Sequence, residues 1–147
     1  MQQRFDVGAV APDGFQAMLG VHHYVDHSGV ALRLLELVRL RVSQLNGCAF
    51  CLGMHVPLAR RHGVSEQELA LLPAWREAPL FSAGERAALA WAEALTQLTP
   101  HGVPDAVYTE MQAQFSTKEI ADVSFAVAEI NAWNRLMAAS RTPPQAG

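Results

Sequence analysis

One helix-start signal, Ser-x-x-Glu, occurs three times in this sequence, and it restricts the possible fold more than any other feature. The three tetrads begin at Ser65, Ser82 and Ser116, and each precedes a segment in which apolar residues recur with helical spacing. In such a capping box the Ser oxygen accepts a hydrogen bond from the amide three residues on, and the Glu carboxylate accepts one from the Ser amide. Three of them in 147 residues predict a succession of helices joined by short loops.

Glycine and proline divide the rest of the chain into segments that carry the same helical period. We expect short helices after Ser65 and over 106–115, and longer ones over 12–27, 30–45, 48–62, 83–98 and 117–139. Pro57 should kink its helix or end it early, because proline lacks an amide hydrogen and clashes with the preceding turn. No segment alternates with period 2, so the predicted fold is all-α, with six to seven helices in one domain over 1–147. Its tail, 141–147, is expected to be disordered.

Composition and charge restrict the classes of partner and cofactor that we expect for this protein. Half of the residues are apolar, 17% are charged and the formal net charge is −3, which provides no basic surface for nucleic acid or an anionic membrane. The N-terminal segment lacks the pattern of a secretory signal, and no stretch has the length of a membrane span. We therefore expect a cytoplasmic protein with no nucleic acid or membrane partner. Because no glycine-rich phosphate loop is present, we expect no nicotinamide or flavin cofactor.

Two groups of polar residues suggest no chemistry of their own. Arg33, Arg39 and Arg41, with Glu36 among them, are interpreted as a solvated or interfacial helix face. The histidines outside the cysteine segment form no constellation and are interpreted as surface or packing residues, namely His22, His23, His27, His62 and His101.

The only two cysteines, Cys48 and Cys51, stand three residues apart, and His55 follows four residues later. At about 100° per residue all three lie on one narrow helix face, and Cys51 can touch His55. A histidine beside a thiol can accept its proton or stabilise the thiolate, which is the nucleophilic form. Two thiols at this spacing also suit a redox cycle in which one becomes a sulfenic acid and the other condenses with it.

Spacing alone leaves other interpretations open. The two cysteines could be packed thiols of the core, or with the neighbouring histidine they could bind zinc, taking Glu36 or His62 as a fourth ligand. Glu36 itself could orient the histidine from the preceding helix, or it could pair with Arg33 or Arg39 one turn away.

The segment "ELVRLRVSQLNGCAFCLGMHVPLARRHGVSEQEL" resembles the core motif of the AhpD-like alkylhydroperoxidases, in the carboxymuconolactone decarboxylase superfamily. The family signature is a Glu, a Cys-x-x-Cys twelve residues on, and a His four residues past the second Cys. Here these residues are Glu36, Cys48, Cys51 and His55. The core motif covers about 32–98, and the likeness reaches "EINAWNRL" near the C-terminus.

This resemblance implies an all-helical homo-oligomer, a hexamer or a trimer, with the Cys-x-x-Cys at the N-terminus of a central helix. It implies a thiol-dependent peroxidase in which Cys51 attacks the hydroperoxide and Cys48 resolves the product. His55 would act as the base, with Glu36 orienting it, and an external thiol or protein would supply electrons. Phe50 stands where well-known members carry a second histidine, so activity could be lower or the oxidant different.

Two other functions are carried as alternatives. One is a zinc- or thiol-bearing structural or regulatory module without turnover. The other is a lyase of the carboxymuconolactone decarboxylase type, for which His55 and Glu36 would matter and the thiols would not.

Overall fold

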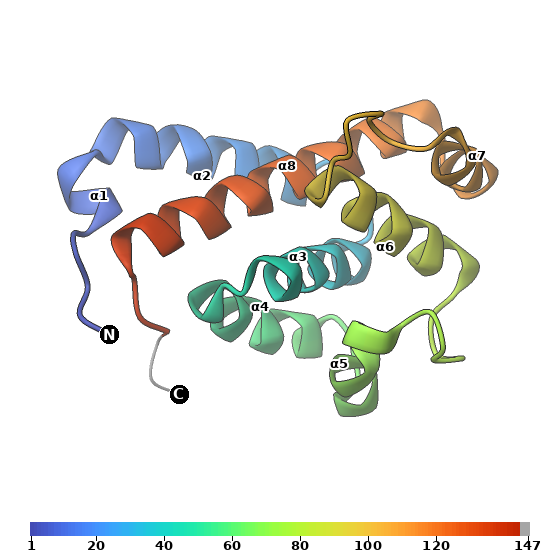
Figure 1. Cartoon of the computed structure of the whole chain (residues 1–147), viewed down its shortest axis with the longest axis horizontal. Coiled ribbons are helices and arrows are strands. Elements are labelled where there is room, and N and C mark those ends of the chain that lie inside the picture. The colour runs from blue at the N-terminus through green and yellow to red at the C-terminus, as the bar shows by residue number, and fades with distance from the viewer. Residues whose placement is uncertain (145–147) are drawn as a thin grey trace.

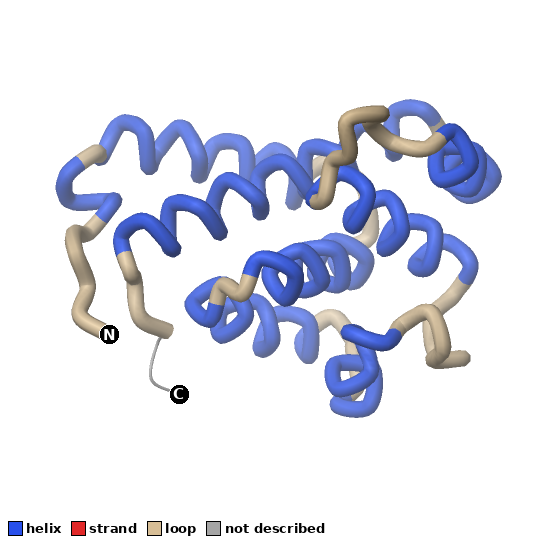
Figure 2. The backbone as a smooth tube through the Cα atoms, in the orientation of Figure 1, coloured by secondary structure: helices blue, strands red, loops and turns tan. Residues whose placement is uncertain are grey.

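The computed structural model describes residues 1–144, and within that range the chain forms eight α-helices, one 3₁₀ turn and no strand (Figures 1 and 2). The helices are α1 (Val7–Val10), α2 (Pro12–Asp26), α3 (Leu32–Asn46), α4 (Ala49–Arg61), α5 (Glu66–Leu71), α6 (Ala83–Thr96), α7 (Asp105–Gln114) and α8 (Thr117–Ser140), with the 3₁₀ turn at Leu72–Ala74. The all-α prediction is confirmed. The additional helix, α1, spans four residues, which is too short for its sequence to show a helical period.

All three predicted capping boxes are present, at the starts of α5, α6 and α8. In the first, the Ser65 hydroxyl accepts a bond of 3.2 Å from the Glu68 amide, and the Glu68 carboxylate accepts one of 2.8 Å from the Ser65 amide. These bonds satisfy amides that have no partner inside the helix, so the local sequence determines where these three helices begin.

Helix α4 contains Pro57 and nevertheless continues to Arg61, so the expected early end is wrong. The missing amide of Pro57 would have paired with the carbonyl of Gly53, one turn earlier. Both residues are exposed, so water can reach the carbonyl that is left without an amide. The helix therefore tolerates the proline on its solvent side.

Helix α3 is central, with α4, α6 and α8 packed around it (Figure 1). Helix α2 lies along α8 on the outer side. Because neighbours cover α3 on several sides, its apolar residues are buried on more than one face, namely Leu34, Leu35, Leu37, Val38, Leu40 and Val42. This helix carries Glu36, and α4, which carries both cysteines, follows it after one tight turn.

The two terminal segments run close together near the end of α8 (Figure 1). The Arg4 amide donates a hydrogen bond of 2.8 Å to the carbonyl of Ser140. Of the predicted disordered tail, 145–147 lie outside the described residues, whereas the Thr142 amide donates a bond of 3.1 Å to the carbonyl of Met137. Among the described helices, none is long and apolar enough to cross a bilayer.

Candidate functional site

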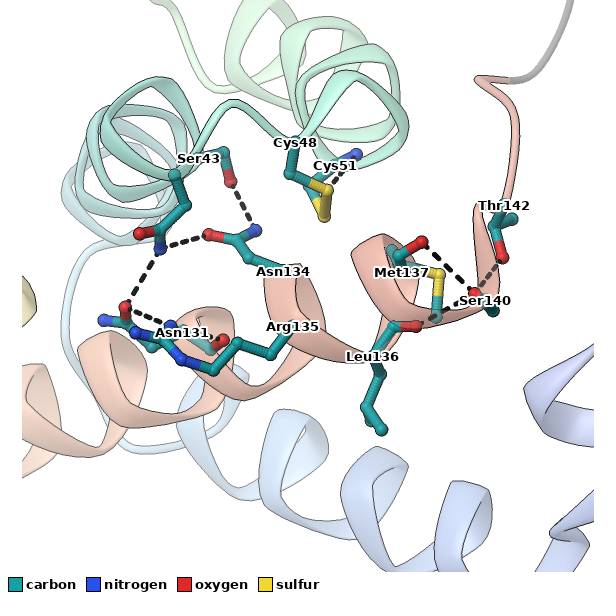
Figure 3. Close-up of a disulfide and its surroundings, with 11 residues drawn as sticks. Ser43, Cys48, Cys51, Asn131, Asn134, Arg135, Leu136, Met137, Ser140 and Thr142 are labelled. Carbon is teal, nitrogen blue, oxygen red and sulfur yellow. Dashed lines mark hydrogen bonds between the residues drawn. A yellow bond between two sulfur atoms is a disulfide. The ribbon is translucent and has the colours of Figure 1, made fainter. Parts of the chain in front are cut away.

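The two cysteines lie at the tight junction between α3 and α4. Gly47 ends α3 with φ of +66°, in the left-handed region that favours glycine, and Cys48 then caps the N-terminus of α4. The Cys48 sulfur accepts a hydrogen bond of 3.3 Å from the Cys51 amide. The two sulfurs are joined in a disulfide across one helical turn, with Cα atoms 5.3 Å apart (Figure 3). Both cysteines are buried.

His55 follows Cys51 by one turn on α4, and its imidazole is held by α3. Nδ1 of His55 lies 2.7 Å from Oε2 of Glu36, and both side chains are buried. With Nδ1 engaged by the carboxylate, Nε2 remains the imidazole nitrogen that can serve the cavity beside Cys51. The structure thus brings together Glu36 and His55 from neighbouring helices.

Glu36 also makes the contact that was considered as an alternative. Its other oxygen, Oε1, accepts a bond of 2.9 Å from Nη1 of Arg39, one turn along the same helix. Burial acts to raise the pKa of the Glu36 carboxyl, but the hydrogen bond and charge of His55 and the charge of Arg39 outweigh it, so this pKa is lowered. The carboxylate is therefore kept ionised between an arginine and the histidine.

Arg39 lies at the centre of a buried charge cluster, so its interpretation as part of a solvated helix face is wrong. It has no exposed surface, and its guanidinium lies 2.9 Å from Glu36, 3.0 Å from Glu129 and 2.7 Å from Asp26. Burial acts to lower its pKa, but these three carboxylates raise it overall. Because α3 is covered on several sides, an arginine in its middle has no route to solvent.

His22 belongs to the same cluster and lines the same cavity as Cys51, so the sequence alone missed its place. Its Nδ1 lies 2.8 Å from Glu129 and its Nε2 lies 3.2 Å from Asp26. The hydrogen bond with Glu129 raises the pKa of His22 against opposing effects of burial and of the Arg39 charge. The only local signal was the spacing of His22 and Asp26, one helical turn apart.

A cavity of about 330 Å³ opens over Cys51 and His55. Its walls are mostly apolar and come from α1, α2, α4 and α8, with Phe15, Phe50 and Trp133 among the lining residues. Phe15 and Trp133 pack edge to face with ring centres 5.3 Å apart. The volume and lining suit a small, largely apolar ligand that meets the Cys51 sulfur and the imidazoles of His55 and His22.

A chain of amide side chains fixes the end of α3 against α8 next to Cys48 (Figure 3). Asn134 donates to Ser43 over 3.1 Å, and Asn46 donates to Asn134 over 2.9 Å and to Asn131 over 3.0 Å. These bonds hold the turn that carries the first cysteine, so α8 supports the position of the disulfide without contributing a reactive group.

Within residues 1–144, no group of three or more His, Cys, Asp or Glu side chains is arranged to hold a metal ion.

Comparison with known proteins places the chain among relatives that share its length and fold. Residues 12–94 match the model of the Carboxymuconolactone decarboxylase family. The chain is 36% identical to the uncharacterized protein YdfG of Bacillus subtilis over 136 residues, covering 92% of each chain. It superposes with a TM-score of 0.95 on ATU0492 of Agrobacterium tumefaciens, a protein of unknown function provisionally described as the antioxidant defence protein AhpD. In that pair the identity is 37%, over 99% of this chain and 100% of the other.

More distant structures share the fold. An uncharacterized peroxidase-related protein from Ralstonia eutropha, described as an alkylhydroperoxidase AhpD core, gives a TM-score of 0.83 at 20% identity, over 95% of this chain and 74% of the other. The debrominase Bmp8 gives 0.80 at 22% identity, over 92% and 73%. At these identities the likeness shows the helical fold alone.

Proposed function

Because the chain belongs to the carboxymuconolactone decarboxylase family as an AhpD-like member, we propose that it is a thiol-dependent peroxidase. In this proposal Cys51 reduces a hydroperoxide and Cys48 closes the catalytic disulfide. One observation carries the proposal: Cys51 opens, beside a carboxylate-bound His55, onto a mostly apolar cavity, with a second cysteine in disulfide range.

The chemistry begins with the reduced protein, in which His55 takes the proton of the Cys51 thiol. The thiolate attacks the terminal oxygen of the hydroperoxide, the O–O bond breaks, and the departing alkoxide takes the proton from the imidazolium. Cys51 is now a sulfenic acid. The Cys48 thiolate attacks this sulfur, the S–O bond breaks, and the hydroxide leaves as water after taking up a proton. The disulfide that results is reduced by an external thiol or protein.

Glu36 acts on this sequence through His55 rather than on the substrate. Its carboxylate fixes the imidazole by Nδ1 and opposes the positive charge that the imidazole gains when it takes the thiol proton. Arg39 in turn holds Glu36 by its second oxygen, so both are positioning residues.

Phe50 takes the position at which well-known alkylhydroperoxidases carry a second histidine, and it lines the cavity. The proton relay in this chain therefore relies on His55. The mostly apolar lining favours organic hydroperoxides over hydrogen peroxide, which offers no apolar surface to bury.

We also expect a homo-oligomer, with a hexamer or a trimer as the assembly. Aromatic residues remain half exposed on the outer side, where Tyr24 of α2 packs edge to face with Phe125 of α8. Light scattering of the purified protein tests this expectation, and a monomer would contradict it.

The proposed activity is tested by thiol titration of reduced, metal-stripped protein before and after one equivalent of cumene hydroperoxide. We expect both thiols to disappear without interchain crosslinks. Cys51→Ser should consume no peroxide. The matched variant, Cys48→Ser, should consume one equivalent and retain a sulfenic acid on Cys51 that a dimedone probe labels.

If both thiols survive the hydroperoxide in the unmodified protein, the peroxidase proposal is wrong. The lyase alternative then predicts that the protein turns over a muconolactone. This activity should persist in Cys51→Ser and be lost in His55→Gln. The zinc alternative predicts one metal per chain, released when the thiols are alkylated.

A further inference from the structure

The two sulfurs of the disulfide face different cavities. Cys51 lines the cavity of about 330 Å³ that also contains His55, and Cys48 is absent from its lining. Cys48 lines a second cavity, of about 420 Å³, to which Cys51 does not contribute. Phe50, Met137 and Thr142 contribute to the lining of both, so they form part of the wall between the two spaces. Each sulfur is therefore reached from its own side.

The lining of the second cavity is mostly apolar, and the two charged side chains in it are both positive. Its charged side chains are those of Arg4, which lies beside the end of α8, and of Arg141, which directly follows α8. No carboxylate side chain is among its lining residues, and within residues 1–144 neither guanidinium pairs with a carboxylate. Arg4 donates one bond of 3.2 Å to the Ala139 carbonyl, and its other guanidinium donors have no partner among residues 1–144. By contrast, the first cavity has a carboxylate, Asp6, in its lining, and its two histidines, His22 and His55, each lie within hydrogen-bond distance of a buried glutamate.

We propose that the second cavity binds an anionic low-molecular-weight thiol, which reduces the disulfide by attacking Cys48. This inference rests on the proposed redox cycle and assigns its electron donor a site and a charge. The cavity volume falls within the range of small-molecule sites. The two guanidiniums suit a carboxylate on the donor, because arginine recognises that group through paired donors.

Reduction then proceeds in two exchanges. The donor thiolate attacks the Cys48 sulfur, a new S–S bond forms there, and the Cys48–Cys51 bond breaks. The electron pair leaves on Cys51, whose thiolate lies next to His55, and a stabilised leaving thiolate speeds such exchange. A second donor thiolate attacks the donor sulfur of the mixed disulfide and releases Cys48 as a thiolate together with the oxidised donor. Two donor thiols are thus oxidised for each protein disulfide reduced.

This route also explains the separation of the two cavities. A thiolate attacks a disulfide along the S–S axis, so an attack that expels Cys51 must come from the Cys48 side. The peroxide side remains available for substrate, and the wall that includes Phe50 keeps donor and oxidant apart. A histidine in place of Phe50 would put a polar side chain into the wall between the two cavities.

The test uses three thiols of similar size that differ in charge: 3-mercaptopropionate, 2-mercaptoethanol and cysteamine. The protein is first oxidised with diamide, so the assay does not depend on peroxide activity. Second-order rates of disulfide reduction are measured at low salt. Each rate is divided by the thiolate fraction of that thiol and by its rate with a neutral model disulfide, because a more basic thiolate is a stronger nucleophile. We expect the anionic thiol to react about three- to tenfold faster than the neutral one, and the cationic thiol to be slowest.

Amino-acid substitutions test whether the preference for an anionic thiol arises at the second cavity. Arg141→Gln, and its combination with Arg4→Gln, should remove most of the charge preference, whereas Arg61→Gln, at the far end of α4, should leave it unchanged. Quenching the reaction with acid and mapping the peptide that contains both cysteines should find the small thiol on Cys48 and a free thiol on Cys51.

The proposal is overturned if corrected rates do not depend on donor charge, if the arginine variants keep the wild-type order, or if the mixed disulfide forms on Cys51. These outcomes are distinct from failure of the peroxidase itself. A protein that ignores cumene hydroperoxide but keeps the charge order has the thiol site without the proposed activity. One that consumes peroxide without the charge order has the activity without this site.

Discussion

Replacing Arg39 with Met removes the only guanidinium of the buried charge cluster while keeping a side chain of comparable length. Three carboxylates, Glu36, Glu129 and Asp26, then lose a partner that lies within 3.0 Å of each. His22 and His55 are the remaining groups that can carry positive charge beside them. We expect Arg39→Met to be destabilised far more than any variant of an exposed arginine.

The magnitude follows from the burial of each partner. The side chains of Glu36 and Glu129 are 4% and 0% exposed, so their lost pairing is hardly replaced by water, whereas Asp26, at 29%, contributes little. Removing one partner of a buried ion pair costs about 3 to 5 kcal/mol. Because His22, whose pKa is raised, still compensates part of the charge, we expect a loss of about 3 kcal/mol at pH 7. For a domain of this size the Tm should fall by roughly 10 °C.

The loss should also depend on pH. The lowered pKa of Glu36 means that its carboxylate stabilises the native protein above the unfolded pKa of about 4.5, and that this contribution is lost as pH falls through the folded pKa. Without Arg39, the buried carboxylates accept protons at higher pH and so relieve their own repulsion. The difference in stability between wild type and Arg39→Met should therefore shrink between pH 7 and pH 5.

Urea unfolding of the oxidised proteins, followed by tryptophan fluorescence at both pH values, measures these differences. Arg61→Gln serves as the exposed control, and Arg39→Lys, which keeps a charge but loses the planar fork, should fall between wild type and Arg39→Met. A loss below about 1 kcal/mol at pH 7, or one that is the same at both pH values, would refute the account of the cluster.

Three further predictions follow from the same geometry. Glu36→Gln keeps a hydrogen-bond acceptor but loses the charge, so stopped-flow measurements should find the reaction of Cys51 with cumene hydroperoxide slowed about 10- to 100-fold. His22→Gln should have a lower free energy of unfolding than wild type. This difference should be largest below pH 6.5 and disappear as pH rises through the raised pKa of His22, and urea unfolding at pH 6 and pH 9 measures it. Pro57→Ala restores an amide for the carbonyl of Gly53 and should raise the free energy of unfolding by about 1 to 3 kcal/mol, with no change in the peroxide rate.

Local signals explain how far the helices could be predicted. Capping boxes depend on residues three positions apart, so the starts of α5, α6 and α8 can be predicted from the sequence alone. Cys51 and His55 share a face of one helix for the same reason. The contact between Glu36 and His55 depends on how α3 packs on α4, so the spacing left it as one of two alternatives, and the family signature favoured it.

Arg39 and His22 could not be placed in this way because their environment is made by distant parts of the chain. His22 meets Glu129 across 107 residues, and Arg39 meets the same carboxylate across 90. An arginine surrounded by other charges in the sequence has the pattern of a surface residue, and only the packing of three helices around α3 shows that it is buried. The second cavity was likewise beyond prediction, since the two terminal segments build part of it.

The disulfide encloses only two residues between its cysteines. By the chain-entropy relation, a loop this short restricts the unfolded chain by about 2 kcal/mol, compared with nearly 5 kcal/mol for a loop of a hundred residues. Opening and closing the bond therefore changes the folding equilibrium much less than a long-range crosslink would. In the proposed redox cycle the scaffold therefore alternates between its two oxidation states without unfolding, so the stability of the fold is largely separated from the chemistry of the thiols.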